Sequence, residues 1–130
     1  MAVVLVVNDD ADMLDIYESL LLSMGHQPVT KMAIGSGPET VREVGADALL
    51  VDLQRPDEDD YGVRIIEEMR ADPHTSELPI VLCTGAAEAV RTLTPQLDAL
   101  GVPVVIKPFA VRDLERTLNA ALEGRADRRA

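Results

Sequence analysis

Four short, uninterrupted apolar runs divide this chain, and each stops at a residue that can bind or react. Residues 3–7 precede Asn8-Asp9-Asp10, residues 48–51 precede Asp52, residues 80–83 precede Thr84, and residues 104–106 precede Lys107. Runs of this length are too short for helices, and their continuous apolar character predicts strands that are buried on both faces. Such strands are typical of a parallel sheet that helices cover on both sides.

Segments with helical spacing separate these strands. Helices are expected at residues 10–24, 38–44, 61–71, 86–100 and 110–122, and strands at residues 3–7, 27–30, 47–51, 79–83 and 102–106. Pro28 predicts that the second strand lies at an edge, and Pro95 predicts a break or kink in the fourth helix. The alternation predicts an α/β fold with right-handed crossovers. The specific expectation is a flavodoxin-like (βα)5 doubly wound five-stranded parallel sheet with strand order 2-1-3-4-5.

Length and composition indicate one domain. The 130 residues are 47% hydrophobic, which is enough for a core of ordinary size. We expect one domain over residues 1–122 and a polar C-terminal tail over residues 123–130. The aromatic side chains are Tyr17, Tyr61 and Phe109, and there is no tryptophan. The core must therefore be mainly aliphatic, which suits parallel strands.

Charge and cysteine content exclude several classes of protein. The net charge is −11, which argues against direct nucleic-acid binding, because such binding depends on Lys and Arg neutralising phosphates. The apolar runs are too short to cross a membrane, and residues 1–10 lack the positive flank and cleavage site of a signal peptide. Cys83 is the only cysteine, so we expect a buried thiol, no disulfide within the chain and a reducing, cytoplasmic location.

The residues that follow the strands should meet at one edge of the sheet. In an open parallel sheet the carboxyl ends of the strands share an edge, and ligands bind there at the switch point. Strand order 2-1-3-4-5 sets Asp9 and Asp10 beside Asp52, with Thr84 and Lys107 close by. Carboxylates packed this closely repel one another, and Mg²⁺, which prefers oxygen ligands, would relieve the repulsion. A cation, a free carboxylate, a hydroxyl and an ammonium together predict a site that handles a phosphoryl group.

Four stretches resemble the receiver domain of two-component response regulators. They are VVNDD at 6–10, VDLQRP at 51–56, LCTG at 82–85 and IKPF at 106–109. Each lies at a strand end, all four occur in order, and the resemblance covers about residues 1–122. It implies a CheY-like receiver that is phosphorylated by a histidine kinase or a phosphotransfer protein with Mg²⁺. Such a receiver signals through phosphorylation-dependent protein–protein interaction.

The resemblance also implies a set of metal ligands. Asp9 matches the acid that binds Mg²⁺ directly, and Asn8 matches the preceding acidic position, which acts through a water. Gln54 would offer its backbone carbonyl, and Asp52 would itself be a ligand. The implied cofactor is Mg²⁺ alone.

The remaining roles belong to the phosphoryl group. Asp52 would accept it, Thr84 would turn its hydroxyl toward a phosphoryl oxygen, and Lys107 would pair with Asp52 and then with the phosphate. The Lys107–Pro108 peptide is expected to be cis, which an X–Pro bond accepts at low energy. No other enzymatic activity is implied: the chain would catalyse only its own phosphorylation and dephosphorylation at Asp52.

The chain departs from the family at several positions. Asn8 replaces a residue that is usually acidic, which predicts weaker Mg²⁺ binding. Gly62 comes ten residues after the phosphoacceptor instead of eight, so the loop is longer, and its extra residues lie in the acidic run 57–60. Gly85 stands where alanine is usual, and Val104 stands where an aromatic switch residue often sits. These changes leave the phosphorylation chemistry in place and bear on the output surface.

Two other functions fit part of the pattern. A degenerate receiver, acting as a phosphate-independent protein-interaction module, is favoured by Asn8, Gly85 and Val104. A Mg²⁺-dependent phosphatase resembling haloacid dehalogenases would need its nucleophile as the first acid of an Asp-x-Asp pair, which here reads Asn8-Asp9-Asp10. For a receiver, the expected partners are a histidine kinase or phosphotransfer protein, a downstream protein, and a second copy in a homodimer.

Overall fold

The computed structural model describes the backbone of residues 2–129 and the side chains of residues 2–124. The strands are β1 (Val3–Val7), β2 (Gln27–Lys31), β3 (Ala48–Val51), β4 (Ile80–Thr84) and β5 (Val104–Ile106); the helices are α1 (Ala11–Ser23), α2 (Gly37–Val44), α3 (Tyr61–Ala71), α4 (Ala87–Ala99) and α5 (Val111–Arg129). All strand pairs are parallel, in the order β2-β1-β3-β4-β5. This confirms the predicted fold class and strand order.

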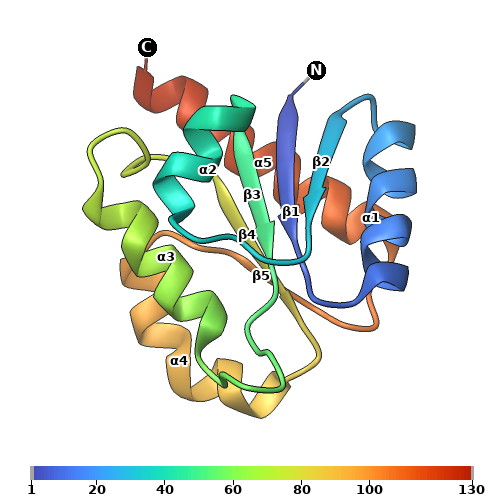
Figure 1. Cartoon of the computed structure of the whole chain (residues 1–130), viewed down its shortest axis with the longest axis vertical. Helices are drawn as coiled ribbons and strands as arrows, with labels where there is room; N and C mark the ends of the chain where they lie inside the picture. The colour runs from blue at the N-terminus through green and yellow to red at the C-terminus, as the bar shows by residue number, and fades with distance from the viewer. Residues whose placement is uncertain (1, 130) are drawn as a thin grey trace.

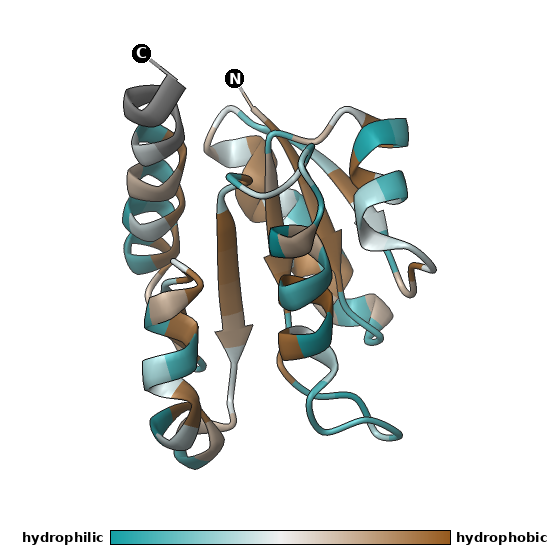
Figure 2. Ribbon diagram, turned by 90° about the vertical axis from the view of Figure 1, so that its left-hand side faces the viewer, coloured by the Kyte–Doolittle hydropathy of each residue, from teal (hydrophilic) through white to brown (hydrophobic). Residues whose placement is uncertain are grey.

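Helices cover both faces of the sheet and make three layers (Figure 1). Successive strand residues face opposite sides, so Leu5 and Val7 of β1 pack with α2, α3 and α4. Val4 and Val6 pack with α1 and α5 on the other face. Strands β1, β3, β4 and β5 are accordingly among the most apolar segments of the molecule (Figure 2). Two apolar layers, one on each face, hold the sheet rigid and fix the positions of the residues at its edge.

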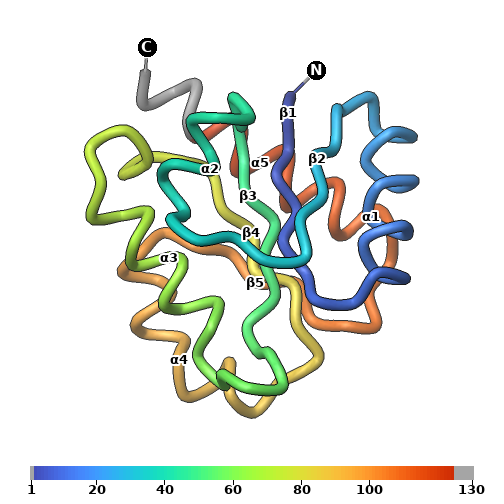
Figure 3. The backbone as a smooth tube through the Cα atoms, in the orientation of Figure 1, coloured from blue at the N-terminus to red at the C-terminus, as the bar shows by residue number. Residues whose placement is uncertain are grey.

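The termini and the strand-end loops lie at opposite ends of the molecule. In Figure 3 the connections that follow β1, β3, β4 and β5 gather in the lower part of the view, away from the N-terminus. The expected edge position of β2 is confirmed, and Pro28 is tolerated there because an edge strand has one unpaired side.

Three features of the helices and strands differ from the sequence-based expectation. A break or a kink was expected at Pro95, and helix α4 does not break there. Pro95 lies on the exposed side, where water can solvate the carbonyl that it leaves unpaired. Strand β5 is shorter than residues 102–106, because Pro103 has no N–H for the ladder. Helix α5 runs to Arg129, past the expected end at residue 122, since all but Gly124 of these residues tolerate helix.

Within residues 2–129, none of the helices combines the length and the apolar character that a membrane span requires.

Candidate functional site

The sheet register brings the strand-end residues together. Val7 and Val51 are Cα partners on β1 and β3, so Asp9 and Asp52 leave the sheet side by side. Thr84 pairs with Ile106 across β4 and β5, which places Lys107 next to Thr84. The register of the strands therefore brings the strand-end residues together at the carboxyl edge of the sheet, as predicted.

Asp52 and Lys107 form the central contact of this edge. The Lys107 Nζ donates to Asp52 Oδ2 at 2.9 Å, and the Lys107 and Asp52 side chains keep exposed fractions of 24% and 22%. Lys107 is thus no ordinary surface lysine. The pair is shielded enough to be ordered and open enough for a reagent to reach the carboxylate.

Thr84 closes the site from the β4 side. Its side chain is buried, and its Oγ1 accepts a hydrogen bond from the Ala86 N–H at 3.1 Å. Accepting this bond leaves the hydroxyl proton free to be donated. The Thr84 carbonyl accepts from the Lys107 N–H at 2.8 Å, so the backbone ties the hydroxyl to the lysine. The Lys107–Pro108 peptide is cis, as expected.

The three polar residues after β1 have different positions. Asn8 is buried, and its Oδ1 accepts from the Asp10 N–H at 2.9 Å. Asp10 is the N-cap of α1, where its Oδ1 accepts from the Asp12 N–H at 2.9 Å. The Asp10 carboxylate therefore serves the helix, as its place in the first turn suggested. Asp9, half-buried, remains as the acid beside Asp52.

The donor set fits Mg²⁺ bound largely by water and phosphate. Across residues 2–124, no three His, Cys, Asp or Glu side chains are grouped to hold a metal, which argues against an all-protein cage. Asp9 and Asp52 supply two carboxylates, and the Gln54 N–H donates to Asp52 Oδ1 at 3.4 Å, so Gln54 adjoins the acceptor. Mg²⁺ is usually held by one or two carboxylates and keeps several waters.

Gly62 lets α3 begin against the end of β3. Its N–H donates to the Leu53 carbonyl at 2.8 Å. A Cβ built at this position would lie 2.5 Å from the Asp52 carbonyl oxygen and 2.8 Å from Leu53 Cα. Only glycine allows this approach to the backbone of Asp52 and Leu53, despite the longer loop.

An aromatic and thiol cluster lies beneath the site. The Tyr17 and Phe109 rings stack with centroids 6.4 Å apart, and the Tyr17 hydroxyl is buried close to the Cys83 thiol. Burial raises the pKa of Cys83 to about 12 and raises the pKa of Tyr17 above its usual range. No spacing in the sequence predicts this cluster, although it holds two of the chain's three aromatic residues. Their positions, on the helix after β1 and directly after Lys107-Pro108, were the available signal.

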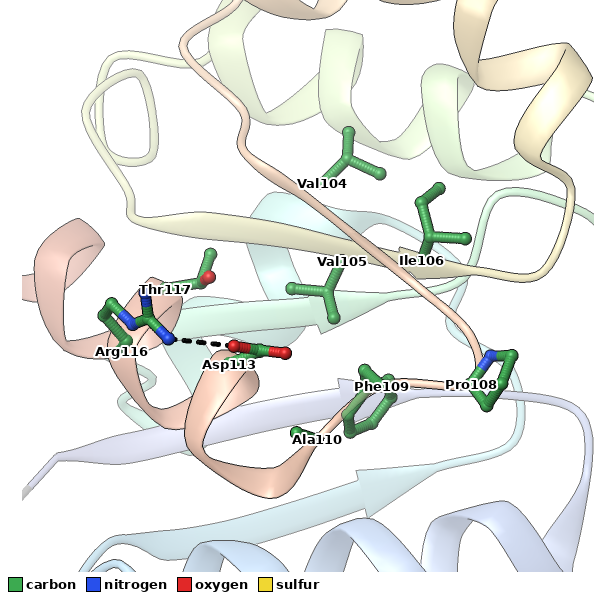
Figure 4. A pocket seen from close by; sticks show the side chains of 9 residues that line it. All are labelled: Val104, Val105, Ile106, Pro108, Phe109, Ala110, Asp113, Arg116 and Thr117. Carbon is green, nitrogen blue, oxygen red and sulfur yellow. Dashed lines mark hydrogen bonds and ion pairs between the residues drawn. The ribbon is translucent and has the colours of Figure 1, made fainter.

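The β5 surface carries aliphatic side chains. Val104 and Ile106 project to one side of β5, and Val105 and Phe109 lie on the other (Figure 4). These residues line a pocket that Arg116 and Asp113 of α5 close with an ion pair of 2.9 Å. Val104 is partly buried against the core beneath α4. The position expected for an aromatic switch residue thus holds a small side chain packed in the strand.

Comparison with known proteins agrees with this geometry. A family model described as the response regulator receiver domain matches residues 4–119. The probable transcriptional regulator ycf27 of Porphyra purpurea is 30% identical over 128 residues, covering 96% of this chain and 49% of the relative. The chain spans about half the length of the curated relatives it matches.

Solved structures show the same likeness. The receiver domain of sensor histidine kinase PA1611 from Pseudomonas aeruginosa PAO1, which has a magnesium ion coordinated in its active-site cleft, is 26% identical with a TM-score of 0.73, covering 94% of this chain and 98% of that one. The chemotaxis protein CheY4 of Vibrio cholerae, at 21% identity and a TM-score of 0.76 over 93% of this chain and 98% of that one, shows the shared fold alone. Because the family match spans most of the chain and the fold agrees with it, this chain belongs to the response regulator receiver domain family of two-component signalling.

Proposed function

We propose that Asp52 accepts a phosphoryl group from a phosphohistidine on a histidine kinase or a phosphotransfer protein. The observation that carries this proposal is the 2.9 Å contact between Lys107 Nζ and Asp52 Oδ2 at the open edge of the sheet. In the transfer, an Asp52 oxygen forms a bond to phosphorus and the phosphorus–nitrogen bond breaks. The imidazole nitrogen takes up a proton, and the product on Asp52 is an acyl phosphate.

Lys107 and Thr84 respond to the new group. The Lys107 ammonium pairs with Asp52 before transfer, and a phosphoryl group on Asp52 offers it stronger acceptor oxygens. The Thr84 hydroxyl retains a proton that it can donate to another of these oxygens. Water removes the phosphoryl group at the same site, so the chain acts on no substrate besides its own Asp52. The acyl phosphate is a local charge change that shifts a conformational equilibrium.

The metal belongs to the same proposal. Asp9, Asp52 and the Gln54 carbonyl, with Asn8 through a water, would hold Mg²⁺, which neutralises charge on the transferring phosphoryl oxygens. Asp9 and Asp52 are like charges at the same edge of the sheet, and Lys107 pairs with Asp52. Binding of Mg²⁺ would therefore reduce the repulsion between the Asp9 and Asp52 carboxylates.

The output is binding to a protein partner, which includes a second copy of this chain. A net charge of −11 opposes contact with nucleic acid. The relatives named as transcriptional regulators are about twice as long as this chain, and no DNA-binding role is proposed for it. We place the reaction in the cytoplasm, where the Cys83 thiol would stay reduced.

The test is the intact mass of the protein after incubation with acetyl phosphate and Mg²⁺. We expect a single phosphoryl adduct that requires Mg²⁺ and is absent from Asp52→Asn. Asp57→Asn is the matched control, because this acid is exposed in the same loop and should leave the adduct unchanged. An adduct that persists in folded Asp52→Asn would place the acceptor elsewhere.

The second candidate is a degenerate receiver that binds its partner without phosphate. It is favoured by the aliphatic Val104, which lacks the ring that follows Thr84 in the common switch, and by the uncharged Asn8. A folded protein that gains no adduct, beside a control receiver that does, would favour this module.

A further inference from the structure

We propose that Arg55 is a positioning residue for the cation site, because it anchors the loop that carries the Gln54 carbonyl. The proposal rests on the function proposed above. Arg55 contributes no ligand itself, and it had no assigned role in the sequence. It acts by fixing the backbone of its neighbour in a long and acidic loop.

The extra residues after Asp52 fold into a tight hairpin. The Arg55 N–H donates to the Glu58 carbonyl at 2.9 Å, and the Glu58 N–H donates to the Arg55 carbonyl at 3.2 Å. The hairpin begins directly after Gln54, whose own N–H donates to Asp52 Oδ1 at 3.4 Å. The position of the Gln54 carbonyl is therefore set between the end of β3 and the first residue of the hairpin.

The Arg55 side chain ties this first residue to two other parts of the fold. Its guanidinium carbon lies 4.3 Å from the centroid of the Tyr61 ring, and its Nη2 donates to the Met32 carbonyl, just after β2. Tyr61 is buried at the start of α3, so this anchor is rigid. The charge of a cation over an aromatic face is attracted by the ring, and more strongly where water is excluded.

The opposite corner of the hairpin is held differently. Glu58 accepts from Arg64 Nε at 2.7 Å and from Arg64 Nη2 at 3.1 Å. Both side chains are well exposed, and exposed pairs contribute little to stability. Glu58 is also farther along the chain from Gln54 than Arg55 is. Arg64 therefore offers a matched control: it is an arginine of α3 that contacts Glu58 of the hairpin and lies 5.2 Å from the Tyr61 ring centroid, and it does not adjoin the Gln54 carbonyl.

The hydrogen bond from Arg55 to the Met32 carbonyl joins the start of the hairpin to the β2–α2 connection, and Arg55→Ala removes it. Residues 57, 59 and 60 are exposed acids, and their repulsion favours an open loop. Mg²⁺ binding would then have to order the Gln54 backbone. Fixing one residue reduces affinity by about tenfold, so we expect Arg55→Ala to raise the Mg²⁺ dissociation constant by about that factor.

The experiment is a Mg²⁺ titration at constant ionic strength, followed by amide chemical shifts, on the wild type, Arg55→Ala, Arg55→Lys and Arg64→Ala. Arg55→Ala should bind about tenfold more weakly, Arg55→Lys should recover part of the loss, and Arg64→Ala should match the wild type. Wild-type affinity in folded Arg55→Ala overturns the proposal, and so does an equal loss in Arg64→Ala.

A second readout separates positioning from general damage. With acetyl phosphate, Arg55→Ala should need more Mg²⁺ for half-maximal phosphorylation and reach the wild-type rate at saturation. A lower rate at saturating Mg²⁺ would overturn the positioning role. Failure of the proposed function looks different, because the wild type itself would then gain no phosphoryl adduct at any Mg²⁺ concentration. If Arg55→Ala does not fold, Arg55→Lys provides the comparison.

Discussion

At the scale of single residues, the charge of the site depends on Asn8. The resemblance implies an acid at this position, and the structure gives Asn8 a second task, because its Oδ1 accepts the Asp10 N–H. Lys107 pairs with the Asp52 carboxylate, and Asp9 adds a second carboxylate after β1. A site of this charge binds a divalent cation less tightly than one with a third carboxylate.

Changing Asn8→Asp tests this balance. A carboxylate can still accept the Asp10 N–H, so the start of α1 should persist, while the added charge should tighten Mg²⁺ binding by roughly tenfold. The unfolding midpoint without Mg²⁺ should fall, since three carboxylates repel more than two. Titration and thermal unfolding measure the two effects. Unchanged affinity would mean that residue 8 does not sense the cation.

Cys83 makes stability depend on pH in the alkaline range. Its ordinary pKa is 9.0, and burial raises it to about 12. The folded chain therefore keeps a proton that the unfolded chain releases, and stability is lost as pH rises from the unfolded pKa toward the folded one. The slope for one group approaches 1.4 kcal/mol per pH unit, as an order of magnitude.

Urea unfolding of the wild type and Cys83→Ala on both sides of the unfolded pKa measures this contribution. The wild type should lose stability more steeply above that pKa. The variant should retain a shallower loss, because burial also raises the pKa of Tyr17. Parallel curves would show that the thiol does not titrate differently in the two states.

At the scale of elements, the sequence predicts what local patterns determine. Continuous apolar runs locate the strands, and helical spacing predicts α3 at its observed bounds. The continuity of α4 through Pro95 depends on solvation, and the end of α5 lies in a polar segment with no apolar periodicity, so the pattern predicts neither. Asp52, Thr84 and Lys107 were predictable because strand ends share an edge. The Tyr17–Cys83 contact and the Arg55 anchor were not, because they join residues with no common spacing.

The placement of α3 on β3 yields a prediction at Gly62. Gly62→Ala brings a Cβ against the Asp52 backbone, so we expect about 1–3 kcal/mol of destabilisation and weaker phosphorylation. Gly85→Ala is the control, since nothing lies within 4 Å of the added atom. It should be neutral or slightly stabilising. Chemical denaturation compares the pair, and an equal effect of both changes would contradict the close approach.

At the scale of the whole molecule, charge repulsion and metal binding act on the same equilibrium. The net charge of −11 means that any salt which screens repulsion favours the compact state. Mg²⁺ should add a specific term, because a ligand that binds only the folded state stabilises it by about 2.7 kcal/mol at a hundred times its dissociation constant.

Thermal unfolding at matched ionic strength separates the two effects. Mg²⁺ should raise the wild-type midpoint by roughly 10 °C beyond Na⁺. Asp9→Asn should respond equally to both salts, since it lacks the acid that binds the metal. If the variant keeps the full Mg²⁺ increment, the stabilising ions bind somewhere else on the surface.

The thiol of Cys83 is buried in an interior strand, so the rate at which it reacts with a reagent reports on opening of the sheet. A disulfide reagent in solution cannot meet Cys83 while β4 is paired on both sides. The rate at which Cys83 is modified therefore measures how often the sheet opens. Thr84 is the next residue along the strand. A ligand that binds at the strand ends and favours the closed sheet should slow the modification of Cys83 by the same factor. The chain can thus report occupancy of its site with no added label.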